Sequence, residues 1–179
     1  MPAAPAGSAT VAPYVVSDDA EGLIEFIVDV FGATEVQAAR VEGSDGLILH
    51  AELLLGDSMI TVIERKPNWP YTPAFMRVYV DDVEQACRRA SAQGGIVLTE
   101  PTDYWGDVFA RIKDPFGHLW WVFQHHPPTT WGDDDAAELW INDADLAWGS
   151  FATPELTYIH ASLIEAMDHL RDPRLDPDA

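Results

Sequence analysis

The sequence predicts an α+β fold in which two strand–helix–three-strand modules pair to form an open cup. Two observations support this fold class. The first is an internal repeat, in which residues 16–21 (VSDDAE) match residues 79–84 (YVDDVE) at an offset of 63 residues. The second is that each copy reads as a strand, an acidic helix start, a helix and then further strands. A four-stranded sheet with a helix on one face leaves its other face concave or covered, so two such modules make a cup.

The composition of each segment sets the expected boundaries along the chain. The leader is rich in Pro, Ala, Gly and Ser and is expected to be flexible, and the linker between the modules contains three prolines. The expected segments are a leader at 1–10, a first module at 11–65, a linker at 66–74, a second module at 75–126, and an acidic extension at 127–179 with a helix at about 154–171.

Each predicted helix starts after aspartates and ends at a glycine. An Asp before the first turn accepts hydrogen bonds from unpaired N–H groups, and a Gly after the last turn adopts the left-handed conformation. By the repeat, Gly32 ends the first helix and Gly95 the second. One face of the first helix is expected to be buried, and it carries Leu23, Ile24, Ile27, Val28 and Phe31.

The later strands of the two modules repeat more loosely. Residues 49–53 (LHAEL) correspond to 108–112 (VFARI) at an offset of 59. After a turn in each module, residues 58–63 (SMITVI) correspond to 118–123 (HLWWVF). Because strand residues alternate between faces, this correspondence also predicts which side chains face the cup.

These motifs resemble the vicinal oxygen chelate superfamily, which includes glyoxalase I, extradiol dioxygenases and bleomycin-resistance proteins. The resemblance rests on the repeated strand–Asp-Asp–helix pattern and on the phrases ILHAELLLGDSMI and IKDPFGHLWWVF. It is strongest to the glyoxalase/bleomycin-resistance-like branch with PhnB-type sequences and covers residues 10–126. It implies a fold of two paired βαβββ modules, and it implies the homodimer that members commonly form.

The resemblance also implies where a metal would be held, and this chain lacks the ligands there. Metal-using members place His, Gln or Glu on the first and last strand of each module, and a divalent ion needs three or more such ligands. The corresponding positions here are Val11 or Ala12, Thr61, Phe75 and Trp121. We therefore expect no metal and no other cofactor. His125 and His126 are adjacent on a strand end, so they point to opposite faces and cannot readily share an ion.

An aromatic surface is expected in place of the metal. The strand alternation directs Tyr14, Phe75, Tyr79, Phe109, Trp121 and Phe123 into the cup, with Tyr104 and Trp105 as a lid in the loop before 108–112. A mostly apolar cavity with a few polar groups is the usual form of a small-molecule site. The alternative is that these rings simply fill the cup as core.

Four polar side chains on the same predicted face leave the function open between two classes. His50, Glu52, Arg77 and Arg111 either form a buried Arg–Glu pair or act on a ligand, with His50 as base and Arg111 orienting an anionic group. The first class is a metal-independent protein that binds an aromatic or cationic organic ligand, with possible use in drug sequestration and antibiotic resistance. The second is a metal-free enzyme of secondary metabolism with lyase- or isomerase-type acid–base chemistry. Whether the protein is an enzyme stays open at this point.

The net charge of −20 and the single Cys87 limit the partners and the compartment. So negative a chain repels nucleic acid and anionic membranes, and it has neither an apolar run that spans a membrane nor a disulfide. We expect a cytoplasmic protein. In the extension, Trp131, Trp140 and Trp148 and a helix after Thr153 are expected to pack on the body or on a second subunit, or to cover the cup as a lid. The helix stripe expected to be buried is Leu156, Ile159, Leu163, Met167 and Leu170.

Overall fold

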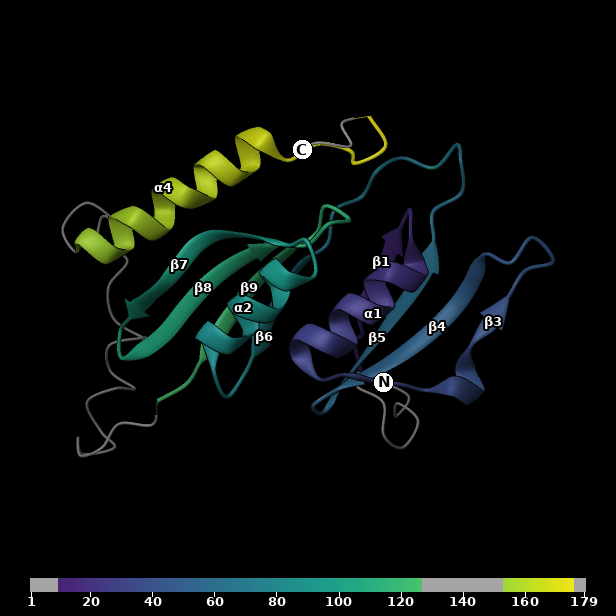
Figure 1. The fold of residues 1–179 in the computed structure, drawn as a ribbon, viewed down its shortest axis with the longest axis horizontal. Helices are drawn as coiled ribbons and strands as arrows, with labels where there is room; N and C mark the ends of the chain where they lie inside the picture. Colours follow the sequence, from purple (N-terminus) through teal and green to yellow (C-terminus); the bar gives the residue numbers. More distant parts are fainter. Residues whose placement is uncertain (1–9, 127–152, 176–179) are drawn as a thin grey trace.

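The computed structural model describes residues 10–126 and 153–175, which form two modules and a C-terminal helix (Figure 1). The predicted leader, apart from residue 10, lies outside the described residues, as do Trp131, Trp140 and Trp148. Within the part that is described, no helix is long and apolar enough to cross a membrane.

The first module is a twisted sheet covered on one face by α1. Its elements are β1 (Tyr14–Ser17), α1 (Ala20–Phe31), β2 (Thr34–Glu35), the short 3-10 helix η1 (Gln37–Ala39), β3 (Val41–Glu42), β4 (Ile48–Leu55) and β5 (Ser58–Glu64). The strand order is β1-β5-β4-β2, and β3 also pairs with β4. The single strand expected after the first helix is thus two short strands on the outer edge of β4.

The second module repeats the same topology, with one long strand, β7, in the place of the two short strands β2 and β3. Its elements are β6 (Phe75–Tyr79), α2 (Val83–Ala92), β7 (Ile96–Tyr104), β8 (Asp107–Lys113) and β9 (Leu119–Gln124), in the order β6-β9-β8-β7. In both modules the first strand runs parallel to the last strand, and the last two strands are antiparallel. The predicted fold class, two paired βαβββ modules, is confirmed.

The hydrogen-bond ladders reproduce the correspondence that the sequence repeat predicts. In the first module Thr61 lies between Tyr14 and Glu52, and in the second Trp121 lies between Arg77 and Arg111. Trp121 is therefore the structural equivalent of Thr61.

The caps at the start of α1 and α2 follow the predicted pattern, whereas the glycine that follows α2 differs from the predicted one. The Asp19 carboxylate accepts a hydrogen bond from Gly22 N at 2.8 Å, and Asp82 accepts one from Gln85 N at 2.7 Å. Gly32 has the expected left-handed φ of 74°. After α2 the left-handed residue is Gly94, with φ 82°, and not the predicted Gly95.

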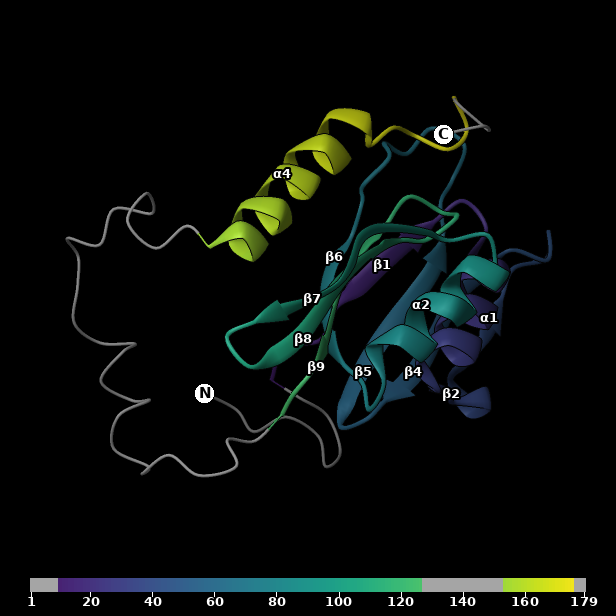
Figure 2. The same cartoon turned by 60° about the vertical axis from the view of Figure 1, so that its left-hand side comes forward.

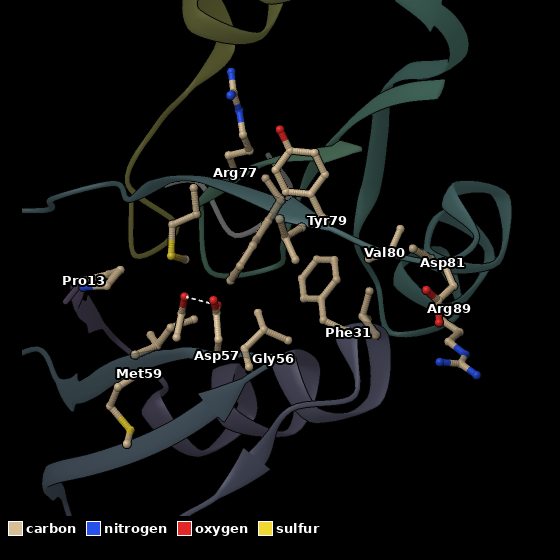
Figure 3. A pocket seen from close by; sticks show the side chains of 18 of the residues that line it. Pro13, Phe31, Gly56, Asp57, Met59, Arg77, Tyr79, Val80, Asp81 and Arg89 are labelled. Atoms are coloured by element: carbon tan, nitrogen blue, oxygen red, sulfur yellow. Dashed lines mark hydrogen bonds between the residues drawn. The ribbon is translucent and has the colours of Figure 1, made fainter. Parts of the chain in front are cut away.

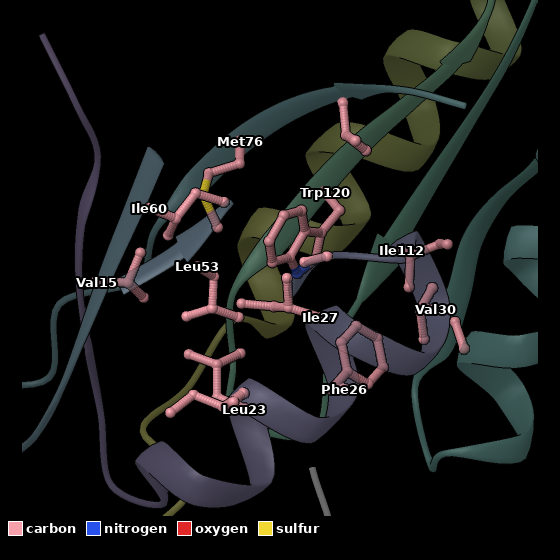
Figure 4. Close-up of a cluster of buried hydrophobic side chains, with 14 of the residues drawn as sticks. Val15, Leu23, Phe26, Ile27, Val30, Leu53, Ile60, Met76, Ile112 and Trp120 are labelled. Carbon is pink, nitrogen blue, oxygen red and sulfur yellow. The ribbon is translucent and has the colours of Figure 1, made fainter. Parts of the chain in front are cut away.

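A single hydrophobic core joins the helix-facing sides of both sheets (Figure 4). Phe31 of α1 lies 4.6 Å from Trp120 of the second module, measured between ring centroids. The buried face of α1 differs from the predicted one, because Phe26 and Val30 are buried whereas Val28 and Phe31 are only partly buried. α1 packs against its own sheet and also meets α2, so its buried face is wider than one stripe.

The turn between β8 and β9 is organised by a buried carboxylate. Asp114 Oδ1 accepts hydrogen bonds from the backbone N–H groups of Phe116 and His118, and its Oδ2 accepts one from the Trp120 indole at 2.8 Å. His118 Nδ1 in turn accepts the backbone N–H of Ala74, the residue that leads into β6. The DPFGH phrase therefore joins the β8–β9 turn to the start of the module.

The C-terminal helix α4 (Pro154–His169) lies on the concave face of the second sheet, opposite α2 (Figure 2). Thr153 caps it through a hydrogen bond from Leu156 N, and Pro154 is its first residue. The predicted buried stripe is wrong in part. Ser162 and Ala166 are the buried residues of this helix, while Met167 is 44% exposed and the rest of the stripe is half-buried.

The chain beyond α4 returns to the first module and forms what we call the C-terminal clasp, made of Asp18, Arg65, Asp172 and Arg174. The buried Arg65 guanidinium donates two hydrogen bonds to the Asp172 carboxylate, at 2.9 and 2.7 Å. Arg174 donates to the carbonyl oxygen of Arg65 at 2.8 Å and lies 3.8 Å from Asp18. The extension therefore contacts both modules.

Candidate functional site

The concave face of the second sheet carries the side chains that the strand alternation predicts. Ala110 and Ile112 are fully buried in the helix-side core, so their neighbours Phe109 and Arg111 point to the opposite, concave face. The same parity holds in the first module, where Ala51 and Leu53 lie in the core. His50 and Glu52 lie on the other face.

The concave face holds two groups of packed rings, a pair and a group of four, which together we call the aromatic wall. Its members are Phe75, Tyr79, Tyr104, Phe109, Trp121 and Phe123. Phe123 lies at the centre of the group of four. Its ring centroid is 5.0 Å from that of Phe109 and 5.6 Å from those of Tyr79 and Tyr104. Phe75 packs edge-on against Trp121 at 5.9 Å.

The aromatic wall is buried on its inner side and open on its outer side. Phe109 and Phe123 are 1% and 5% exposed and act as core. Trp121 is half-buried, and Phe75 and Tyr79 on the edge strand β6 are 52% and 59% exposed. Phe109 and Phe123 therefore fill this face as core, as one of the alternatives from the sequence proposed. The open part of the wall is the β6–β9 side.

The expected lid loop is a tight hairpin turn. Tyr104 is the last residue of β7 and packs into the aromatic wall, while Trp105 and Gly106 form the two-residue connection to β8. Both have positive φ, 54° for Trp105 and 91° for Gly106, as a turn that matches the strand twist requires. A bulky residue rarely adopts this conformation. Tyr104 is therefore part of the wall, and Trp105 lies at its rim.

Two guanidinium groups lie on the aromatic wall. Arg77, which is exposed, lies over the Phe123 ring at 4.9 Å from its centroid. Arg111, which is 1% exposed, lies between the Phe109 and Trp121 rings at 5.2 and 5.0 Å. Arg111 donates hydrogen bonds to Thr99 Oγ1, Ser162 Oγ and the Ile159 carbonyl, and burial lowers its pKa to about 10. It remains charged at neutral pH.

The expected buried Arg–Glu pair is absent from the described residues. Glu52 Oε1 instead accepts a hydrogen bond from His50 Nε2 at 3.2 Å, and both side chains are half-buried on the first sheet. Tyr14, the other predicted residue on this sheet, is 60% exposed. Sequence reasoning missed Thr99 and Ser162 as partners of Arg111; the strand register opposite Arg111 could have revealed Thr99, but nothing local indicates Ser162.

A groove of about 610 Å³ separates the two modules beside the wall (Figure 3). It lies between β6 and the turn at Gly56 and Asp57, with Phe31 and Trp120 among its lining residues. Figure 3 shows Arg77 and Tyr79 extending from β6 away from that turn. The groove reaches the edge strand β6 on the side of Met76 and Val78, whereas the aromatic wall lies on the other face of the same strand.

The residues at the implied metal positions do not fit a metal. Val11 and Ala12 precede β1, and Thr61, Phe75 and Trp121 complete the set without a carboxylate, imidazole or thiolate. Among residues 10–126 and 153–175, no group of three His, Cys, Asp or Glu side chains is arranged to hold an ion. The nearby Arg111 guanidinium would also repel a cation at Trp121. His125 and His126 at the strand end are both exposed, and His125 Nδ1 lies 2.8 Å from Asp107 Oδ1.

Three kinds of comparison relate this chain to known proteins. The uncharacterized proteins Rv0887c of Mycobacterium tuberculosis and Mb0911c of Mycobacterium bovis are each 35% identical to it over 122 residues, which is 62% of this chain and 71% and 79% of theirs. Among solved structures, TioX from Micromonospora sp. ML1 is similar with 26% identity and a TM-score of 0.52, over 65% of this chain and 99% of TioX.

More distant structures share the fold. Protein PA1353 from Pseudomonas aeruginosa has 20% identity and a TM-score of 0.54, over 67% of this chain and all of PA1353. The fosfomycin resistance protein FosX from Listeria monocytogenes has 16% identity and a TM-score of 0.52, over 66% of this chain and 94% of FosX. The sequence profile of the Glyoxalase/Bleomycin resistance protein/Dioxygenase superfamily matches residues 9–122, and the chain belongs to that superfamily.

Proposed function

We propose that this chain is a metal-independent protein that binds a planar aromatic organic ligand on the open side of the aromatic wall. The carrying observation is the exposure of Phe75, Tyr79 and half-buried Trp121 on the β6–β9 side of the wall, on the same face as Phe109 and Phe123, which are already buried as core. Rings held in place by neighbours stack on a flat ligand without losing much side-chain entropy. A role in sequestering a drug, and so in resistance, is part of this proposal and is supported by the superfamily.

The charge on the wall favours a ligand that is neutral or anionic there. The sequence suggested a cationic ligand because the whole chain is acidic. The rings, however, are flanked by Arg77 and Arg111, and both guanidinium groups lie within about 5 Å of a wall ring. A cation stacked on the same rings would be repelled at short range, where repulsion exceeds the screened attraction of distant surface acids.

The prediction for Trp121 tests the proposal. With 2-naphthamide as a neutral planar probe in isothermal titration calorimetry, we expect Trp121→Ala to weaken binding by about 1–3 kcal/mol, a factor of roughly 5 to 150, through lost stacking and buried area. His126→Ala, on an exposed strand end, is the control and should leave the affinity unchanged. Equal affinities for the parent and Trp121→Ala would place the ligand elsewhere.

A second candidate function is a metal-free enzyme that uses acid–base chemistry. The observation that favours it is the contact between His50 and Glu52, because a carboxylate beside an imidazole orients the ring and fixes its tautomer. Mass spectrometry of small molecules that co-purify with the protein would supply candidate ligands. Conversion of such a ligand, abolished by His50→Ala, would support the enzyme. Stoichiometric binding without conversion would support a binding protein.

A further inference from the structure

Arg111 is a buried cation whose contacts are all neutral within the described chain. One nitrogen, Nη1, donates to Thr99 Oγ1 at 2.9 Å, to Ser162 Oγ at 3.2 Å and to the Ile159 carbonyl at 3.3 Å. The buried Nε has no hydrogen-bond partner among the residues described. Buried arginines usually pair with a carboxylate or phosphate, because the cost of removing the charge from water is otherwise only partly offset. This guanidinium therefore has unused capacity for an anion.

The helix that covers Arg111 is loosely packed on the sheet. α4 buries only Ser162 and Ala166, which are both small. A cavity of about 340 Å³ lies between α4 and β7, lined by Val97, Lys113 and Glu165 among others. Three half-buried residues, Leu156, Ile159 and Leu163, make up the rest of its inner side. Little apolar area therefore opposes lifting of the helix, and its C-terminal end is held separately by the C-terminal clasp.

We propose that Arg111 is the anchor for a carboxylate group of an aromatic ligand, and that α4 is a displaceable cover. In the ligand-free protein the Ser162 hydroxyl and the Ile159 carbonyl occupy the place that the carboxylate takes. This inference rests on the proposed function, since the same aromatic wall supplies the stacking surface. The chemical class that fits is an aromatic carboxylate, with its ring on Trp121 and its charge on Arg111.

A matched series of naphthalene probes tests the anchor. 2-Naphthoate, 2-naphthamide and 2-naphthylmethylammonium have the same ring and differ in the charge of the substituent. We expect calorimetry to show the order naphthoate, amide, ammonium from tightest to weakest. Arg111→Met should weaken naphthoate binding roughly tenfold or more and amide binding clearly less, because the amide loses only a neutral hydrogen bond and the carboxylate loses a charge-assisted one. Arg88→Met, an exposed arginine on α2, makes the same charge change as the control.

The possible outcomes separate the anchor from the proposed function. If the amide binds to the wall but naphthoate is no tighter, or keeps its advantage in Arg111→Met, the anchor is wrong and the aromatic site stands. If none of the three probes binds at millimolar concentration, the aromatic site itself is wrong. If the ammonium probe binds best, the acidic exterior dominates and Arg111 has no such role.

A cross-link tests the cover. Thr99 Oγ1 and Ser162 Oγ are 2.7 Å apart, so Thr99→Cys/Ser162→Cys places two thiols for a disulfide between β7 and α4, and the native Cys87 is buried. The oxidised variant should lose naphthoate binding by tenfold or more, and reduction should restore it. Ser162→Ala is the second test, because removing the competing hydroxyl should strengthen naphthoate binding. Equal affinity of the oxidised and reduced forms, or weaker naphthoate binding by Ser162→Ala, would overturn the proposal that α4 is a displaceable cover.

Discussion

At the scale of single residues, two buried ionisable side chains, Asp114 and Arg111, differ in how well their hydrogen-bonding groups are partnered. Asp114 accepts three N–H hydrogen bonds and so fixes the β8–β9 turn and the Trp120 indole in place. Arg111 is equally buried but faces only neutral acceptors and two rings. The three hydrogen bonds of Asp114 partly offset its burial, which still raises the pKa of the carboxyl, whereas no charged partner among the described residues offsets the burial of Arg111. Stability therefore explains Asp114, and Arg111 requires another explanation.

We predict that Arg111→Met raises the free energy of unfolding by about 1–3 kcal/mol at pH 7. Methionine fills similar space, and Thr99 and Ser162 remain hydrogen-bonded to each other. Burial lowers the pKa of Arg111 to about 10, so the folded state disfavours the charged form. The free-energy cost of burying the charged guanidinium is fully present below this pKa and falls as the pH rises through it. The stability that Arg111→Met gains over the parent should therefore decrease above pH 10.

Urea denaturation of the parent and the variant measures this difference. Arg65→Met is the matched control, because Arg65 is also buried but donates two hydrogen bonds to Asp172. The control should lose stability. A comparable loss in Arg111→Met would show that Arg111 is held for structural reasons.

At the scale of elements, the position of α4 depends on two separate contacts. Its middle lies on the second sheet through Ser162 and Ala166, and the C-terminal clasp ties the following residues to the end of β5. The Arg65 guanidinium lowers the pKa of the Asp172 carboxyl below its ordinary value. Because the folded pKa is lowered, the ion pair stabilises the fold above the ordinary Asp pKa and is lost as the pH falls through the lowered one.

We predict that Asp172→Asn loosens α4 without unfolding the modules. Loss of a charge-assisted pair that includes a buried guanidinium should cost about 1–3 kcal/mol. Hydrogen exchange should become faster in α4 amides, while amides of β4, β5 and α1 keep their protection. Asp168→Asn, exposed on the same helix, removes the same charge and should have little effect. Unchanged exchange in α4 would mean that sheet contacts alone hold the helix.

At the scale of the whole molecule, two equivalent modules present different chemistry to the cup. The first sheet contributes His50, Glu52 and the exposed Tyr14, and the second contributes the aromatic wall and two arginines. The groove between them runs from β6 to the β4–β5 turn, on the side of β6 that faces away from the wall.

We predict that the purified protein carries no stoichiometric divalent metal. Elemental analysis after incubation with excess zinc, nickel and manganese, followed by desalting, should give far less than one ion per chain, because Thr61, Phe75 and Trp121 supply no ligand. About one zinc, nickel, manganese or iron per chain would contradict this.

We also predict a homodimer, in line with the superfamily and with apolar side chains left exposed on the outer face of α4. Ile164 is 50% exposed there and Met167 is 44% exposed. Light scattering at micromolar concentration should give about twice the chain mass of 19.8 kDa. Ile164→Glu should lower the mass towards that of one chain, and Glu165→Lys beside it should not. A monodisperse monomer of the parent protein would refute the dimer.

Local and periodic features of the sequence determined the modules, the caps and the face of each strand. Asp19 and Asp82 act within one turn of the chain, and the alternation that buries Ala110 and Ile112 depends only on strand geometry. The residue types at positions 61, 75 and 121 could likewise be assigned from the sequence, through its repeat together with its resemblance to the superfamily. Such features need no knowledge of distant segments.

Only the tertiary structure decided what covers the site and which ring is core. The sequence alternation treats Phe109 and Phe75 alike, yet one lies on a central strand under its neighbours and the other on an exposed edge. Arg111 meets Ser162 across 51 residues and Arg65 meets Asp172 across 107. Contacts of that separation depend on where whole elements come to rest, and neither residue periodicity nor capping signals carry that information.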